Sequence, residues 1–83
     1  MSLMEEVIDV PVGHQKNIFG QFDSFIKTIE KTLNVTLITR NDEIKLIGEA
    51  ENVIKAKNII SQLFELSKSG NIITDQNVNY ALS

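Results

Sequence analysis

Few residues of this 83-residue chain could carry out covalent chemistry. The chain has one histidine, His14, and no cysteine, so it can build neither a Cys-His pair nor a thiolate metal site. His14 has no acidic neighbour nearer in the sequence than Asp9, which disfavours a Ser-His-Asp arrangement. None of the four glycines, at positions 13, 20, 48 and 70, begins the Gly-x-x-x-x-Gly-Lys-Ser/Thr pattern that holds nucleotide phosphates. We therefore expect no catalytic, cofactor-binding or metal site in this chain.

The charge balance restricts the ligands that the chain could bind. Eleven Asp and Glu against eight Lys and Arg give a formal net charge of −3. Non-specific binding to a polyanion needs a surplus of cations, so any nucleic-acid surface must be local. The acidic residues have neither the spacing of a calcium loop nor that of paired acid–base carboxylates. Asp42 and Glu43 fall in an expected hairpin turn, where turn formation and solubility account for them.

The best candidate for a local surface is the turn at Gly20. Four residues form this candidate site: Lys16, Gly20, Lys27 and Arg40. Glycine there breaks a helix and readily adopts the positive φ that such a break needs. Lys31 would add to a basic rim formed by the lysines. The alternative is an ordinary solvated helix face on which Glu30 balances the lysines, with Arg40 as an exposed strand end.

Three phenylalanines near the same turn allow two interpretations. Aromatic side chains on an exposed platform can stack on nucleobases. Phe22, however, falls at helical spacing with Ile26 and Ile29, which predicts that it lies in the core. For Phe19 the sequence favours neither the core nor an exposed platform.

Hydrophobic periodicity predicts the elements that must position these residues. Alternating apolar residues predict a strand over 6–12, which Pro11 either ends or restricts to a sheet edge. A short helix over 14–19 is expected to stop at Gly20. An amphipathic helix follows, with Asp23 as its N-cap and Asn34 in the left-handed conformation at its end.

The second half of the chain predicts a hairpin and two helices. β-branched residues indicate a strand over 35–40 and a returning strand over 44–47, joined by a tight turn. A long helix is expected from about Ala50 to about Ser67, and Thr74 can cap a short last helix after a loop over 67–71. The expected fold is an α+β two-layer sandwich, a three-stranded sheet with helices on one face. The alternative is a ferredoxin-like fold, in which Ile72 and Ile73 would pair with residues 7–10.

The length fits one domain. With 42% hydrophobic and 23% charged residues, we expect residues 4–83 to form a single core. Residues 1–3 precede a second methionine, Met4, and are interpreted as an expression leader. No apolar run approaches the roughly 18 residues that span a bilayer, so we expect no membrane contact and a cytoplasmic location.

The stretch from Ile18 to Val35 resembles the core of K homology (KH) domains. Gly20 matches the first glycine of that family's Gly-x-x-Gly loop, and the Ile-Lys-Thr-Ile of residues 26–29 matches the helix that follows. The resemblance implies a loop whose backbone amides hold phosphates of single-stranded nucleic acid. Asp23 stands at the second glycine position, where its carboxylate is expected to satisfy those amides and repel phosphate.

Residues 7–82 as a whole resemble the N-terminal domain of PhoH-type ATPases. The matching features are, in chain order, Ile18-Phe19-Gly20 with Asp23, Leu33-Asn34-Val35, residues 40–44, Ile47-Gly48, residues 63–66, Gly70 and residues 78–81. In that family the domain is KH-like, precedes a P-loop ATPase core and belongs to proteins linked to phosphate starvation and RNA metabolism. The resemblance implies a domain taken from a larger ATPase, with ATP and magnesium bound only downstream.

The residues leave three functional hypotheses open. In the first, the chain is an accessory domain of a PhoH-like ATPase and binds single-stranded RNA weakly through Lys16, Gly20, Lys27 and Arg40. In the second, it is an assembly module that packs on its own ATPase domain without binding nucleic acid, and homo-oligomerisation stays open. In the third, it is a ferredoxin-like regulatory domain for a small molecule.

Overall fold

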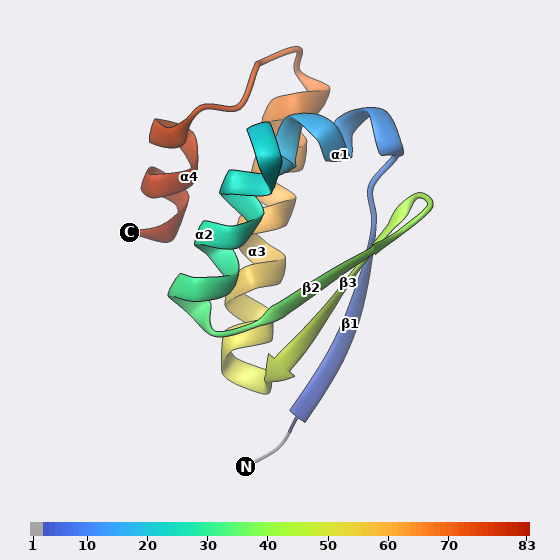
Figure 1. The fold of residues 1–83 in the computed structure, drawn as a ribbon, viewed down its shortest axis with the longest axis vertical. Coiled ribbons are helices and arrows are strands. Elements are labelled where there is room, and N and C mark those ends of the chain that lie inside the picture. Colours follow the sequence, from blue (N-terminus) through green and yellow to red (C-terminus); the bar gives the residue numbers. More distant parts are fainter. Residues whose placement is uncertain (1–2) are drawn as a thin grey trace.

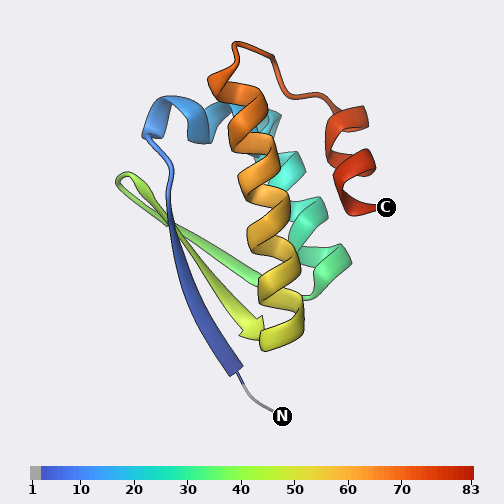
Figure 2. The same ribbon diagram turned by 180° about the vertical axis from the view of Figure 1, so that it is seen from behind.

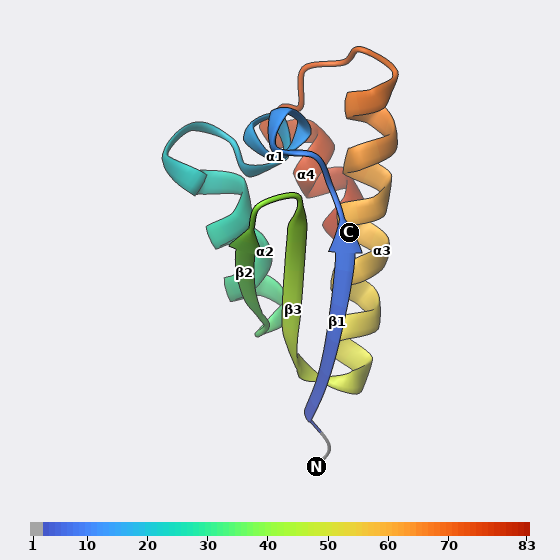
Figure 3. The same ribbon diagram turned by 90° about the vertical axis from the view of Figure 1, so that its right-hand side faces the viewer.

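The computed structural model describes residues 3–83 and contains one antiparallel sheet and four α-helices. The elements, in chain order, are β1 (Leu3–Asp9), α1 (Val12–Phe19), a 3-10 turn η1 (Gln21–Asp23), α2 (Ser24–Leu33), β2 (Thr36–Arg40), β3 (Glu43–Glu49), α3 (Ala50–Lys68) and α4 (Asp75–Leu82). Figure 3 shows the strands in front and the helices behind them, so the helices cover one face of the sheet. The last helix, α4, lies on the side of α2 and α3 that faces away from the sheet (Figures 1 and 2).

The sheet has the strand order β1-β3-β2, which makes β3 its central strand. β1 pairs with β3 from Leu3 opposite Glu49 to Asp9 opposite Glu43, and β2 pairs with β3 over residues 36–40. Because side chains alternate along a strand, Ile44 and Leu46 of β3 point beneath the helices and are fully buried. The sheet therefore supplies one floor of the core.

The core joins this floor to the inner faces of all four helices. Its largest fully buried side chains are Val10, Ile18, Ile29, Ile44, Leu46, Val53, Ile60, Leu63 and Val78. Burial of each such side chain is worth about 1.5–3 kcal/mol. Burial of Ile18 on α1 and Ile29 on α2 fixes the rotation of these two helices. Lys16 and Lys27 consequently lie on exposed faces. None of the helices within residues 3–83 is both long enough and apolar enough to cross a membrane.

The expected order of elements is confirmed, with shifts at the first strand. β1 begins at Leu3 because β3 extends to Glu49 and supplies partners for it, and it ends at Asp9. Pro11 lies beyond the strand as the N-cap residue of α1, and β1 is an edge strand of the sheet. Of the expected leader, residues 1 and 2 lie outside the described residues, whereas Leu3 belongs to β1.

The segment before α4 distinguishes the two folds that the sequence allows. Ile72 and Ile73 form no strand, and the sheet described for residues 3–83 contains only β1, β2 and β3. Thr74 caps α4 as expected: its side chain accepts a hydrogen bond from Asn77 N (3.3 Å), and its backbone N–H donates to Asn77 Oδ1 (2.9 Å). The ferredoxin-like alternative is therefore wrong, and the expected two-layer arrangement of a three-stranded sheet with helices on one face is confirmed.

Candidate functional site

Residues 20–23, here called the Gly20 turn, combine three positive φ angles in a stretch of four residues. Gly20 has a φ of 78°, Phe22 of 56° and Asp23 of 58°. Glycine adopts this region freely and aspartate tolerates it, but for a bulky residue such as Phe22 it is a strained conformation. Asp23 therefore occupies the second glycine position of the KH pattern with the backbone geometry that favours a glycine there.

Asp23 does not cap α2 through its side chain, contrary to the expectation from sequence. It is the N-cap residue, but no capping hydrogen bond forms. N-cap side chains reach the helix amides from an extended backbone, whereas Asp23 is left-handed. The expectation that its carboxylate satisfies these amides is therefore wrong, although its charge stays beside the Gly20 turn.

Gly20 is required on steric grounds as well as for its φ of 78°. A Cβ atom added to it would lie 2.6 Å from Cδ2 and 2.7 Å from Cγ of Phe25. The ring of Phe25, itself half-buried against the core, thus lies directly over the backbone of the turn. Any larger residue would push the ring or the turn aside.

Phe22 lies on the surface, so the expectation from its helical spacing that it lies in the core is wrong. Its side chain is 84% exposed. Phe22 lies in the turn before α2 and is left-handed, so its helical spacing with Ile26 and Ile29 places it on no common face. Phe19 and Phe25 pack partly against the core instead. In Figure 3 the connection between α1 and α2 projects from the helical layer on the β2 side.

The cationic side chains divide by position into paired and unpaired groups. Within residues 3–83 the ion-paired ones lie on β3 and α3: Lys45, Lys55, Lys57 and Lys68. The other four form no ion pair in that range and are all exposed: Lys16 on α1, Lys27 and Lys31 on α2, and Arg40 at the end of β2. Every candidate cation predicted from sequence belongs to the unpaired group.

Glu30 explains why the lysines of α2 stay unpaired. The sequence allows it to balance Lys27 and Lys31, its neighbours on α2. In the structure its Oε2 accepts a 2.8 Å hydrogen bond from the backbone N–H of Leu37 on β2. This carboxylate joins α2 to β2 and forms no ion pair with either lysine in the described residues.

The structure brings two of the four candidate residues into one hollow. Lys16 and Gly20 line it together with Asn17, Gln21, Phe25, Ile72 and Ile73. Lys27 and Arg40 lie outside it. Arg40 adjoins the hairpin turn whose Asp42 Oδ1 accepts a 3.1 Å hydrogen bond from Val12 N, at the start of α1. Gly20 follows the other end of this eight-residue helix, which is about 12 Å long.

A polar network that the sequence analysis missed fixes one wall of this hollow. Asn17 donates to Ser67 Oγ (2.9 Å) and to the carbonyl of Asn71 (2.8 Å), and it accepts from the N–H of Ile73 (2.9 Å). His14 Nδ1 lies 2.7 Å from the same Ser67 hydroxyl. The partners are fifty or more positions apart in the chain, so local patterns carry no sign of the network. It holds the loop before α4 against α1.

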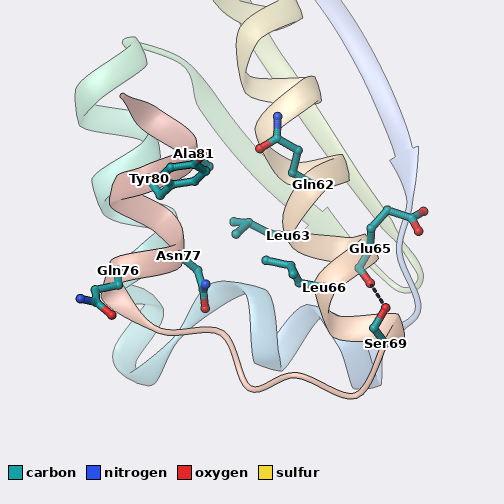
Figure 4. Close-up of a pocket in the computed structure, with 9 residues that line it drawn as sticks. All are labelled: Gln62, Leu63, Glu65, Leu66, Ser69, Gln76, Asn77, Tyr80 and Ala81. Carbon is teal, nitrogen blue, oxygen red and sulfur yellow. Dashed lines mark hydrogen bonds between the residues drawn. The ribbon is translucent and has the colours of Figure 1, made fainter.

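A larger hollow of about 790 Å³ lies between α3 and α4. Figure 4 shows Leu63 and Leu66 pointing from α3 toward α4, where Tyr80 and Ala81 lie. Tyr80 is 83% exposed, so a large aromatic side chain flanks an apolar groove.

Across the described part of the chain, no three His, Asp or Glu side chains are placed to hold a metal ion.

Comparison with known proteins finds relatives in sequence. No family model matches the chain. A PhoH-like protein of Bacillus subtilis (strain 168) is 36% identical over 66 residues, which are 80% of this chain and 21% of that protein. A PhoH-like protein of Mycobacterium bovis is 30% identical over 76 residues, 92% of this chain and 22% of that protein. The chain thus spans about a fifth of the length of these curated relatives.

Solved structures share the fold at lower identity. The fourth KH type I domain of human Vigilin aligns with a TM-score of 0.77 and 18% identity over 89% of this chain and 76% of that chain. A chain of the a/eIF2alpha-aDim2p-rRNA complex of Pyrococcus horikoshii OT3 aligns with a TM-score of 0.78 and 16% identity over 96% of this chain and 45% of that chain. These likenesses establish the fold alone.

Proposed function

Because this chain is a KH-like domain of the PhoH family, we propose that it binds single-stranded RNA weakly at the Gly20 turn. The observation that carries the proposal is the segregation of cations. Lys16, Lys27, Lys31 and Arg40 are free of ion pairs within residues 3–83, whereas every Lys on β3 and α3 is paired. Cations that no carboxylate neutralises are the ones that can release counterions from a phosphate backbone.

The geometry of the turn supports the same proposal. Gly20 lines a hollow together with unpaired Lys16, so the backbone of the turn lies beside a free cation. The N-terminus of α2 begins directly after the turn and carries a partial positive charge. Asp23 opposes both effects, because its carboxylate lies at this helix start and repels phosphate. The net charge of −3 adds to the repulsion, so we expect weak binding that low salt strengthens.

The proposal is tested by titrating single-stranded RNA into the isotope-labelled protein at low salt. We expect chemical-shift changes at the amides of Gly20 and Lys27. Lys27→Gln should weaken binding severalfold, whereas Lys55→Gln, which removes a lysine paired with Glu51 on α3, should change it little. Unchanged shifts at Gly20 and Lys27, or an equal effect of the two substitutions, would contradict the proposal.

The groove between α3 and α4 favours a second function, packing against the remainder of a longer PhoH-family protein. The relatives are about five times as long as the matched segment, so in such a protein most of the mass lies outside this domain. An ATPase core is the partner that the family resemblance implies. Exposed Tyr80 beside Leu63 and Leu66 offers apolar surface for such a contact.

Amide hydrogen exchange would test this second function. In a full-length protein that contains this domain, α4 should exchange more slowly than in the separate domain. Tyr80→Ser should remove that protection, whereas Asn79→Ser, on the preceding exposed residue, should not. Equal exchange of α4 in the two forms would exclude the contact.

A further inference from the structure

Phe22 is the feature that the binding proposal leaves unused. Its ring is 84% exposed, and among the exposed large apolar residues of the described chain only Phe22 and Tyr80 are aromatic. Its φ of 56° lies in the left-handed region, which strains the backbone of a bulky residue. A chain that only needed a turn here would be more stable with Gly or Asn at this position. The exposed ring in a strained backbone therefore calls for a function.

The surroundings of Phe22 favour a nucleobase over a protein partner. Its chain neighbours Gln21, Asp23 and Ser24 are polar and exposed, so no apolar residue next to Phe22 in the chain extends its exposed ring into a patch of the kind that docks proteins. A single ring is nevertheless enough to stack on a base, since every base has a π face. Unpaired Lys16 and Lys27 lie before and after the turn that carries the ring.

We propose that Phe22 stacks on a base of single-stranded RNA whose phosphates lie against the Gly20 turn. The inference rests on the proposed function and deepens it, because it assigns base contact to a residue at the tip of the turn. Stacking is tolerant of sequence, so the contact adds affinity for unpaired bases of any identity and none for double-stranded RNA, whose bases are already stacked.

The absence of tryptophan from the sequence permits a direct test. Phe22→Trp places a single indole at the tip, and stacking on a base quenches indole fluorescence. Two labelled oligonucleotides of equal length would be titrated, a single-stranded RNA and its abasic counterpart, with binding followed by anisotropy. We expect both to bind, the RNA about 5- to 150-fold more tightly, and only the RNA to quench the indole. Tyr80→Trp, an equally exposed site on α4, should show no quenching.

Substitution of the ring gives a second readout. Phe22→Ala should lower RNA affinity by the same 5- to 150-fold and leave affinity for the abasic strand unchanged. Because the side chain is exposed, the fold should survive, which circular dichroism would check. If RNA and abasic strand bind equally and neither quenches the indole, the stacking inference is wrong and the binding proposal stands. If neither oligonucleotide binds, both are wrong.

Discussion

Asp23 occupies, in the left-handed conformation, the position at which the KH pattern has its second glycine. The backbone requirement of the turn is thus preserved, because aspartate tolerates a φ of 58°, while the charge at the helix start becomes negative. The backbone conformation of Asp23 keeps the KH-like turn intact. Its negative charge weakens the attraction of this turn for phosphate.

Asp23→Asn should therefore improve RNA binding without changing stability. Asparagine also tolerates the left-handed region, and the substitution removes a unit charge. A charge about 4–6 Å from a phosphate in water is worth roughly 0.7–1 kcal/mol, so we expect affinity to rise about three- to fivefold. Binding at 50 mM salt and thermal unfolding would be measured together. A stable variant with unchanged affinity would show that the bound phosphates lie far from Asp23.

Gly20→Ala and Gly70→Ala together separate strain in φ from steric clash. Both glycines have positive φ, 78° and 91°, but only at Gly20 would the new Cβ meet another group, the ring of Phe25 at 2.6 Å. We expect Gly70→Ala to cost about 1–2 kcal/mol and Gly20→Ala about 1–3 kcal/mol more. Urea denaturation measures the difference. Equal losses would mean that the ring moves aside without cost.

At the scale of elements, α1 connects the hairpin turn and the loop before α4 to the Gly20 turn. Its start receives the hairpin turn, since Gln15 Nε2 donates to the carbonyl of Asn41 and the N–H of Val12 donates to Asp42. Its later residues hold the loop before α4 through Asn17. These hydrogen bonds hold the short hairpin turn against α1.

Asn17→Ala tests the hold of α1 on this loop. The substitution leaves the Asn71 carbonyl and the Ile73 N–H without their partner, and Ser67 keeps only its contact with His14, so we expect a loss of about 1–3 kcal/mol. Faster amide exchange should appear at Ile73 before global unfolding. Thr28→Ala removes one exposed hydrogen bond within α2 and should cost little. If the two substitutions cost the same, the network adds nothing to stability.

Local periodicity predicts the order of elements well because each element buries one face, and it fails where distant residues decide. α1 begins at Val12, before the expected residue 14, because Asp42, thirty positions later, accepts its first N–H. Phe22 has the spacing of a core residue, but the left-handed backbone ahead of α2 removes it from the helix. Lys16, Lys27 and Arg40 are evident candidates from sequence, yet only the ion pairs of β3 and α3 show which cations are free.

On the scale of the whole molecule, four cations without ion pairs in the described residues coexist with a net charge of −3. The four unpaired side chains lie on α1, α2 and the end of β2, whereas those of β3 and α3 are neutralised locally. A polyanion is therefore attracted by α1, α2 and the end of β2 and repelled by the net negative charge of the remainder. The orientation in which the polyanion approaches the protein therefore affects its association more than the net charge does.

The salt dependence of RNA binding should report this division. With at most four cations engaged, the slope of log affinity against log salt should be no steeper than about −3 for a single strand. Lys31→Gln should reduce it by about 0.7, whereas Lys57→Gln, which breaks the 2.7 Å pair with Glu6, should not. Anisotropy titrations between 25 and 200 mM salt would measure both slopes. A slope reduced equally by the two substitutions would show that α3 also contacts RNA.

The position of β3 in the centre of the sheet has a consequence for the timing of folding. Within this domain β1 is synthesised before the other elements, but its only neighbour in the described sheet is β3, with which it pairs from Glu43 to Glu49. In the nascent chain β1 therefore stays unpaired until α1, α2 and the hairpin of β2 and β3 have been synthesised. At about 5–20 residues per second this interval lasts seconds, during which Leu3, Val7 and Ile8 are accessible to chaperones.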